Sequence, residues 1–246
     1  MKAILSVIFL VLSFSLLAKP IVTLYVYHLK APYIVDISEQ TGLYFDVADV
    51  FNRYQQQVTF QTHFLPRKRL DKGVEDASLD GLVMGVNPIW FGDLKHEKYL
   101  WTSAVFEDTD DFVSFHKIPF EYEGETSLHQ KTIGGILGYK YFGVDELAAK
   151  DLLTRVNTNE EIHLLDMLLK QRLDVAIVSR STRQYLEAKN HWLGLFHVSE
   201  IPHDRYTRHI MALRSRNEEF EIVNKLLENE QVKRELNLLS YKYHSP

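Results

Sequence analysis

Ten residues in the expected strand-end loops carry groups that could hold a small polar ligand. Aromatic rings stack on ligands and tyrosine hydroxyls orient them, arginine pairs with anions, and the free N–H groups of a glycine turn favour negative charge. The set contains no nucleophile–base pair, so the chemistry that it predicts is binding. The ten residues are Tyr27, Tyr33, Arg69, Asn87, Trp90, Gly138, Tyr139, Tyr141, Ser179 and Arg180.

Each candidate has a second interpretation that the sequence leaves open. The aromatic rings could simply pack a loop against its lobe. Arg69 follows Arg67 and Lys68, so it could belong to a solvated basic helix start. The glycine turn that includes Gly138 lacks the full G-x-G-x-x-G fingerprint, so no nucleotide cofactor is expected. We interpret Arg180 as a substitute positive charge that turns the preference of the site toward carboxylates.

Metal binding and catalysis find little support in the sequence. The chain has no cysteine, which removes disulfides, thiolate ligands and a cysteine nucleophile. Its eleven histidines form no compact ligand pair such as HExxH. Acid–base catalysis requires a positioned carboxylate, and we expect the four acids near the expected cleft to be solvated instead. These acids are Asp36, Glu39, Asp93 and Glu107.

Two similar α/β units position the candidate residues. Residues 69–85 read as an amphipathic helix followed by a short apolar strand, and residues 161–179 repeat this plan. Apolar side chains recur at helical spacing in both helices. Each strand is apolar on both faces, which is typical of a parallel sheet covered by helices. The sequence therefore predicts two α/β lobes with a ligand cleft between them.

The order of the expected elements gives each lobe its boundaries. The chain crosses to the second lobe and later returns, so we assign 19–108 with 204–246 to lobe 1 and 109–203 to lobe 2. Thr158 and Glu161 predict a capping box at a helix start. The expected strands are 21–27, 58–64, 81–86, 111–115, 132–137, 174–178 and 209–213, and the expected helices begin at Asp46 and cover 68–77, 145–153 and 218–239.

The first eighteen residues have the pattern of a secretory signal peptide. Lys2 is followed by an apolar and serine run that ends at Ala18, and this run is shorter than the roughly 20 apolar residues of a spanning helix. Leu16 makes the cleavage site less regular, so an uncleaved anchor stays the alternative. Cleavage removes the charge of Lys2 and takes the net charge from −5 to −6. A mildly acidic periplasmic protein that does not bind nucleic acid is expected.

Four strings, by their order and spacing, resemble the family 3 solute-binding proteins. These are the class II periplasmic binding proteins that serve ABC importers of amino acids and related polar solutes. The resemblance spans nearly the whole mature chain and implies a hinged monomer without a cofactor, whose lobes close over a ligand. The strings are APY at 31–33, GLYFDVADVF at 42–51, PRKRLDKGVEDASLDGLVMG at 66–85 and LHQKTIGGILGYKY at 128–141.

The resemblance also points to two ligand clamps, and both charged groups are replaced in this chain. In the family, an arginine two residues beyond a proline pairs with the ligand carboxylate, whereas here Pro88 is followed by Ile89 and Trp90. An aspartate that ends the lobe 2 strand receives the ligand ammonium, whereas here the residue is Ser179. Charge-assisted contacts are the strongest of such a site, so their replacement argues against an ordinary amino acid as the ligand.

The expected function is the capture of a small polar solute, amino-acid-like or a small carboxylate, for an ABC permease. A ligand-sensing protein for a membrane receptor is the first alternative, because sensing uses the same closure of two lobes. A dehydratase on the same fold, acting on cyclic carboxylic acids, is the second.

Overall fold

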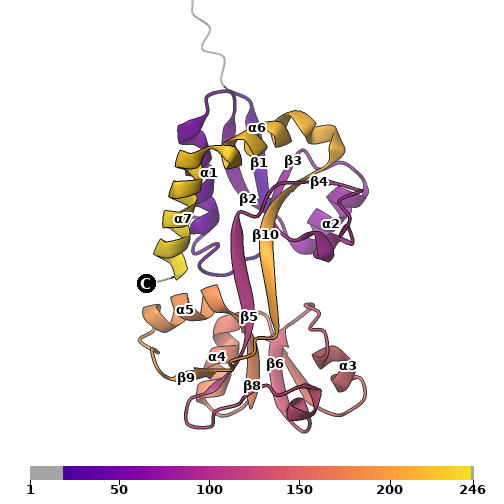
Figure 1. Cartoon of the computed structure of the whole chain (residues 1–246), viewed down its shortest axis with the longest axis vertical. Coiled ribbons are helices and arrows are strands. Elements are labelled where there is room, and N and C mark those ends of the chain that lie inside the picture. Colours follow the sequence, from indigo (N-terminus) through magenta and orange to yellow (C-terminus); the bar gives the residue numbers. More distant parts are fainter. Residues whose placement is uncertain (1–18, 245–246) are drawn as a thin grey trace, which may run out of the picture.

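Two lobes, joined by two long strands, make up the described part of the chain. The structure is a computed structural model that describes residues 19–244, so the expected signal peptide lies outside the described residues. Figure 1 shows one lobe above the other, with β5 (Phe106–Phe115) and β10 (Asp204–Ala212) running between them. Within residues 19–244, no helix is long and apolar enough to cross a membrane.

Lobe 1 is built from both ends of the chain. Its helix α1 (Leu43–Tyr54) buries a face that includes Val47, Val50 and Phe51, which recur at helical spacing. This face packs into a core with Leu24 of β1 (Ile21–Val26). The other elements of lobe 1 are β2 (Thr59–Phe64), β3 (Gly81–Val86), β4 (Leu100–Trp101), α2 (Arg67–Glu75), α6 (Asn217–Glu228), α7 (Glu230–His244) and the 3₁₀ turns Pro88–Phe91 and Arg214–Arg216.

Lobe 2 is a continuous stretch of chain with cores of its own. Helix α4 (Glu161–Leu169) contributes Leu164 and Leu165 to one of them, packed against Val178 of β8 (Val175–Ser179). The remaining elements of lobe 2 are β6 (Thr132–Ile136), β7 (Thr154–Thr158), β9 (Phe196–Val198), α3 (Val144–Ala148), α5 (Arg180–Lys189) and the 3₁₀ turn Glu125–Leu128.

One sheet path runs through both lobes, in the order β2-β1-β3-β10-β5-β8-β6-β7. Strand β1 is parallel to β2 and β3 in lobe 1, and β6 is parallel to β7 and β8 in lobe 2. Strand β10 is antiparallel to β3 through one part of its length and to β5 through the other. The loops that follow β1, β3, β6 and β8 therefore lie toward the junction of the lobes, as in other α/β ligand sites.

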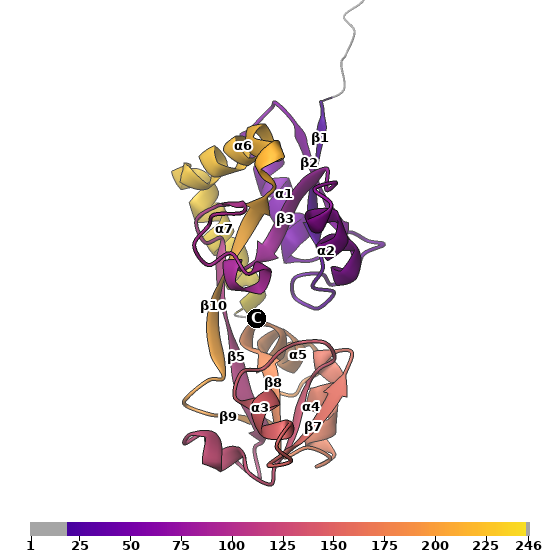
Figure 2. The same cartoon turned by 90° about the vertical axis from the view of Figure 1, so that its right-hand side faces the viewer.

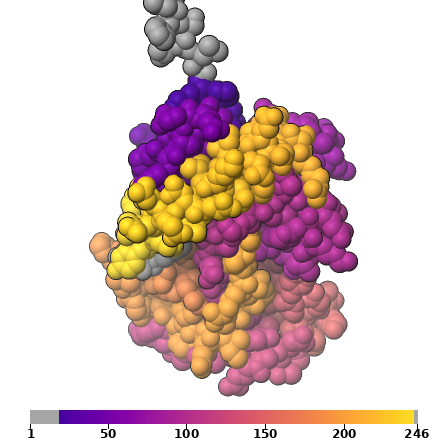
Figure 3. Space-filling view, turned by 45° about the horizontal axis from the view of Figure 1, so that its top comes forward, coloured from indigo at the N-terminus to yellow at the C-terminus, as the bar shows by residue number. Residues whose placement is uncertain are grey.

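The C-terminal helix also spans the junction. Helix α7 packs on α1 and α6 of lobe 1, and it contacts α5 of lobe 2. Figures 1 and 2 both place the C-terminal end of α7 close to α5. In the space-filling view of Figure 3, the yellow C-terminal segment lies across the indigo part of lobe 1 and meets the orange part of lobe 2.

Most strands lie where the sequence places them, and the misses have local causes. Strand 81–86 is observed over the same residues, and it is buried throughout like β8. Strand β7 was not predicted because its sequence, TRVNT, is mostly polar and half-exposed. The helix predicted over 218–239 is two helices, because the backbone at Asn229 is extended. The predicted capping box is wrong: Glu160 is the N-cap residue, and the side chain of Glu161 turns toward lobe 1.

Replacing Gly42 by alanine is expected to destabilise the protein by about 2 kcal/mol. Gly42 has a φ of 131°, and an added Cβ would lie 2.7 Å from the Tyr33 carbonyl oxygen and 2.8 Å from the Val35 nitrogen. These are backbone atoms, so relief requires the loop that carries Tyr33 to move. Urea unfolding measures the loss. Gly73→Ala in α2 is the control, because its Cβ meets only the side chains of Leu79 and Ser78; an equal loss there would contradict the argument.

Candidate functional site

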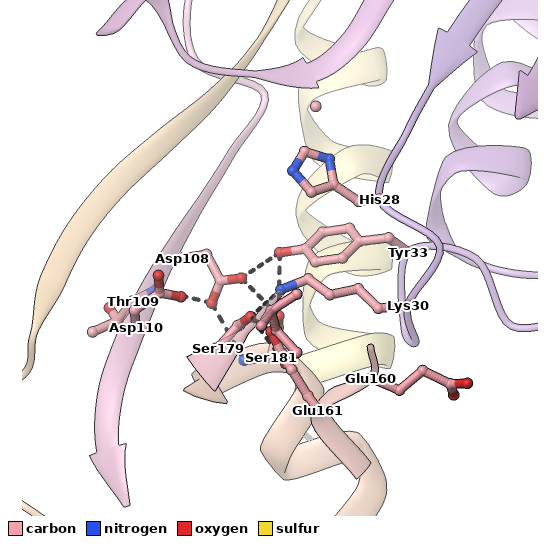
Figure 4. Close-up of polar contacts among 12 residues, drawn as sticks. His28, Lys30, Tyr33, Asp108, Thr109, Asp110, Glu160, Glu161, Ser179 and Ser181 are labelled. Carbon is pink, nitrogen blue, oxygen red and sulfur yellow. Dashed lines mark hydrogen bonds and ion pairs between the residues drawn. The ribbon is translucent and has the colours of Figure 1, made fainter. Parts of the chain in front are cut away.

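A polar cluster of side chains from both lobes lies between them (Figure 4). Lys30 of lobe 1 donates hydrogen bonds to Glu161 Oε1, at 2.7 Å, and to the hydroxyl of Ser179. Ser179 in turn donates to Glu161 at 2.9 Å. The side chains of Lys30 and Glu161 are only 12% and 4% exposed, so this ion pair is shielded from water. We define the interlobe cluster as Lys30, Tyr33, Asp108, Glu161, Ser179 and Ser181.

The hydroxyl of Tyr33 connects three elements within the interlobe cluster. It donates to Asp108 Oδ2 of β5 at 2.5 Å, and the Ser181 hydroxyl of α5 lies 3.2 Å from it. It also accepts a bond from Nε of Arg208, on β10, at 3.0 Å. Ser181 completes the arrangement by donating to Asp108 at 2.7 Å. The loop after β1 is thereby tied to both connecting strands and to lobe 2.

Arg208 is a buried cation in an aromatic surrounding. It is 1% exposed, and its Nη1 donates to the carbonyl of Gly85 at 3.0 Å. Its guanidinium carbon lies 4.4 Å from the ring centroid of Tyr33, 5.0 Å from that of Tyr206 and 5.5 Å from that of Trp90. Rings at these distances stabilise a cation through their quadrupoles, and the carboxylate of Asp108 lies 3.6 Å from Nη2.

The two aspartates of β5 in this region have opposite pKa shifts. Burial alone would raise the pKa of Asp108, but the charges of Arg208 and Lys30 and the bonds from its neighbours outweigh burial and lower it. Burial raises the pKa of Asp110 to about 7; Lys30 opposes the rise, and the nearby negative charges of Glu161 and Asp108 add to it. Asp108 is therefore charged at neutral pH, while Asp110 titrates there.

His28 lies between the aromatic rings of lobe 1. Its ring centroid is 3.9 Å from that of Tyr27 and 5.6 Å from that of Trp90. Burial lowers its pKa well below the usual value, and the positive charges of Arg208 and Lys30 lower it further. The ring is therefore neutral, and its buried Nδ1 has no hydrogen-bond partner among the described residues.

A cavity of about 640 Å³ adjoins the interlobe cluster. This volume falls within the range of small-molecule sites. The cavity shares Asp108 and Ser181 with the cluster, and both lobes contribute to its wall. Its wall residues include Asn87, Ile89 and Leu94 from lobe 1, Arg180 and Gln184 from lobe 2, and Glu107, Arg205, Tyr206 and Thr207 from the connecting strands.

Several of the ten sequence-predicted residues meet at the junction of the lobes. Tyr33 and Ser179 belong to the interlobe cluster, and Asn87 and Arg180 line the cavity. Arg180 also forms a bidentate pair with Asp111, with its Nη2 2.7 Å and its Nε 3.0 Å from the two carboxylate oxygens. Tyr27 and Trp90 pack around His28, as described above.

The other predicted residues are Tyr139, Tyr141, Gly138 and Arg69. Burial raises the pKa of Tyr139 to about 12, and the negative charge of Glu161 adds to the rise, so Tyr139 lies near the interlobe cluster. Tyr141 is 3% exposed and packs in a core of lobe 2, with its ring 6.5 Å from that of Tyr139. Gly138 and Arg69 are exposed. The basic residue that reaches the aromatic rings is Arg67, whose Nη1 donates to the Tyr27 hydroxyl at 2.9 Å.

Sequence reasoning did not select Lys30, Asp108, Glu161 or Arg208. Lys30 lies in the loop that was expected to place Tyr33, but only the aromatic residues there were considered. Two signals could have pointed to the others: Asp108 lies in an acidic run, EDTDD at 107–111, inside a strand, and Arg208 is a cation beside an apolar strand end. A charge at a buried strand position requires a partner. The sequence pattern assigned Glu161 to a helix capping box, so it was not considered as a residue of the site.

The acids considered for catalysis have structural roles or lie in the open. Asp93 accepts three backbone N–H bonds, from residues 97, 98 and 99, and one from Trp101. These bonds outweigh its burial and lower its pKa to about 2. Asp36 caps an exposed turn at Ser38, while Glu107 lines the cavity. Within the described residues, no group of three or more histidine, aspartate or glutamate side chains could hold a metal ion.

Comparison with solved structures shows the same architecture elsewhere, although no protein-family model and no curated protein matches the chain. A mutant of ArgBP from T. maritima is 16% identical, with a TM-score of 0.69 over 92% of this chain and 96% of that one. The substrate-binding protein of an amino acid ABC transporter is 14% identical, with a TM-score of 0.65 over 92% and 100%. The VFT2 domain of BvgS from Bordetella pertussis is 13% identical, with a TM-score of 0.66 over 91% and 93%.

These neighbours are similar in structure far more than in sequence. The likeness covers nearly the whole length of both chains, so it includes both lobes. The solved neighbours represent the family 3 solute-binding proteins. The described chain therefore has the mixed α/β, two-lobe fold of the class II periplasmic binding proteins.

Proposed function

We propose that the protein is a periplasmic binding protein that captures a small polar solute between its lobes. One observation carries the proposal: polar side chains of both lobes converge on the interlobe cluster, beside a cavity of about 640 Å³. Strands β5 and β10 connect the lobes next to this cavity, and closure about such a hinge is a common way to enclose a ligand. The protein is proposed to bind and release its solute without changing it.

The proposed solute is amino-acid-like or a small carboxylate, and the second is favoured. The resemblance to the family 3 solute-binding proteins implies that Trp90 and Ser179 replace the charged clamps for an amino acid. Arg180 lies on the cavity wall with a side chain that is 38% exposed, so its guanidinium is available to an anion while Asp111 holds it in place. Of the ten residues predicted from the sequence, Asn87 and Arg180 line the cavity and are the first proposed contacts. Tyr33 and Ser179 of the interlobe cluster are the next, and the other six stay predictions.

The proposed hinge lies where β5 and β10 pair, with 19–108 and 204–246 in lobe 1 and 109–203 in lobe 2. Residues 106–110 of β5 pair with residues 204–208 of β10, so both crossings move together. The register of β10 against β3 shifts between His209 and Ile210. We propose this irregularity as the point at the lobe 1 end of the hinge where the backbone adjusts.

Delivery to an ABC permease is the proposed output of closure. Its support is the likeness to the substrate-binding protein of an amino acid transporter. The likeness to the VFT2 domain of BvgS favours a second candidate, a sensing role in which the closed form contacts a membrane receptor. Crosslinking of the solute-loaded protein to membrane vesicles from its own cells, followed by identification of the crosslinked protein as a permease or a receptor, separates the two.

Thermal unfolding with a solute panel tests the proposed function. The mature protein, unfolded and refolded to remove bound solute, is screened against amino acids, small carboxylates, polyamines and short sugars. Native-state binding at a hundredfold excess over Kd is expected to add about 2.7 kcal/mol of stability. Arg180→Met is expected to weaken the binding of a carboxylate about tenfold, whereas the exposed Arg172→Met serves as the control. No stabilisation by any member of the panel would reject the proposed function.

A further inference from the structure

An ammonium from one lobe occupies an acceptor site on the other. We infer that Glu161 and Ser179 form a binding site for a primary ammonium on lobe 2 and that Lys30 of lobe 1 is its built-in ligand. The inference rests on the proposed function, because it states that the solute captured between the lobes does not have to supply an ammonium. It would also explain why no aspartate is needed at position 179.

The hydrogen bonds within this site leave only acceptor atoms free, so it selects a ligand that donates hydrogen bonds. The Ser179 hydroxyl gives its proton to Glu161, 2.9 Å away, so only its lone pairs remain for a third group. Both oxygens of Glu161 are within bonding distance of that hydroxyl, at 2.9 and 3.2 Å. A hydroxyl turned in this way and a carboxylate can both accept, and neither can donate. An ammonium, with three N–H donors and one positive charge, matches the pair.

Burial makes an occupant necessary. Ser179 is fully buried at the end of β8, and the side chain of Glu161 is 4% exposed at the start of α4. A buried carboxylate without a cation is strongly unfavourable. The Lys30 ammonium lies 2.7 Å from this carboxylate, and Figure 4 shows its side chain reaching in from the lobe 1 loop beside Tyr33. The site is therefore satisfied by the protein itself.

Two consequences follow from the origin of Lys30 in the opposite lobe. The ion pair exists only when the lobes are together, so it favours the closed arrangement before any solute arrives. The solute that fits beside it brings no ammonium of its own to this site. An ammonium-free carboxylate meets that condition, whereas an amino acid has to displace Lys30.

Chemical rescue tests the ammonium site without knowledge of the solute. The chain has no cysteine, so spin labels can be placed through Lys72→Cys in lobe 1 and Lys150→Cys in lobe 2, both exposed positions. Pulsed electron paramagnetic resonance then measures the distance between the lobes in solute-stripped protein. Lys30→Ala is expected to shift the main population to a longer distance. n-Propylammonium replaces the atoms that this substitution removes and is expected to restore the short distance.

The controls separate charge, size and folding. n-Propanol has a similar size without the charge and is expected to have no effect. Lys68→Ala, at an exposed position of lobe 1, is expected to keep the distance of the unsubstituted protein. Lys30→Met retains most of the apolar stem and serves if Lys30→Ala folds poorly. In a Glu161→Gln background, replacing Lys30 is expected to cause little further opening.

Three outcomes would overturn the inference. They are a long distance in the protein that retains Lys30, an unchanged distance in both Lys30 variants, and equal responses to n-propylammonium and n-propanol. A failure of the proposed function gives a different pattern: the solute panel stays silent while n-propylammonium still closes Lys30→Ala. If a solute binds but the protein that retains Lys30 shows a long interlobe distance, the ammonium site is rejected and the proposed function stands.

Discussion

Arg208→Met is expected to lower the free energy of unfolding by about 3–5 kcal/mol, the usual cost of breaking a buried ion pair. Methionine retains an apolar stem, but it leaves the buried carboxylate of Asp108 without the cation 3.6 Å away. It also removes the donors to the Tyr33 hydroxyl and the Gly85 carbonyl. Urea unfolding followed by circular dichroism measures the difference.

Arg205→Met on the same strand is the matched control. Arg205 is exposed and lies three residues before Arg208, so its loss is expected to change stability by less than about 0.5 kcal/mol. Similar losses in the two variants would show that the strand, and not the buried charge, is sensitive. An Asp108→Asn substitution in the Arg208→Met protein is expected to recover part of the lost stability, because the orphaned charge is then removed.

Asp110→Asn is expected to change how stability depends on pH. The folded protein holds the pKa of Asp110 at about 7, against 3.8 for an ordinary aspartate. Between pH 4 and 7 the unfolded chain has lost a proton that the folded chain keeps, so this group makes the protein less stable as the pH rises. At roughly 1.4 kcal/mol per pKa unit, the shift from 3.8 to about 7 amounts to a total on the order of 4 kcal/mol. Asparagine removes this loss, so the variant is expected to be the more stable protein at pH 8.

Unfolding midpoints at pH 4.5, 6, 7 and 8 measure the effect as a difference between the variant and the original protein. That difference is expected to grow from pH 4.5 to 7 and then level off. Asp204, directly opposite Asp110 in the β5–β10 pair, is exposed, so Asp204→Asn is the control for removing a carboxylate from the same strand pair. A difference for Asp110→Asn that does not change with pH would place the titration elsewhere.

Periodicity was sufficient for most of the fold but not for the contacts between the lobes. Strand β3 is apolar at nearly every position and buried on both faces, so its extent could be read directly. Strand β7 is polar and half-exposed, and its pairing with β6 is a tertiary event that local sequence does not encode. The same limit applies to Lys30 and Glu161, which are 131 residues apart in the chain and meet only when both lobes are in place.

The structure brings together those predicted residues for which residue type and position pointed the same way. Tyr33 and Ser179 follow β1 and end β8, and both meet the interlobe cluster. The prediction for Arg69 rested on its place near a helix start, but Arg67 is the residue that turns toward the rings. Each residue of a helix turns the direction of the side chain by about 100°. Predicted strand and loop boundaries do not fix that direction.

The return of the chain to lobe 1 constrains the order in which the two lobes can fold. The lobe 1 core takes Ile210, Val223 and Val232 from the last part of the chain, and β3 needs β10 as its neighbour. The lobe 2 cores need nothing beyond Phe196. During elongation, lobe 2 therefore has its complete set of apolar contacts while the N-terminal strands still wait for theirs. Long-range pairing of this kind slows folding, so the strands β1 and β3 are among the last elements to be fully buried.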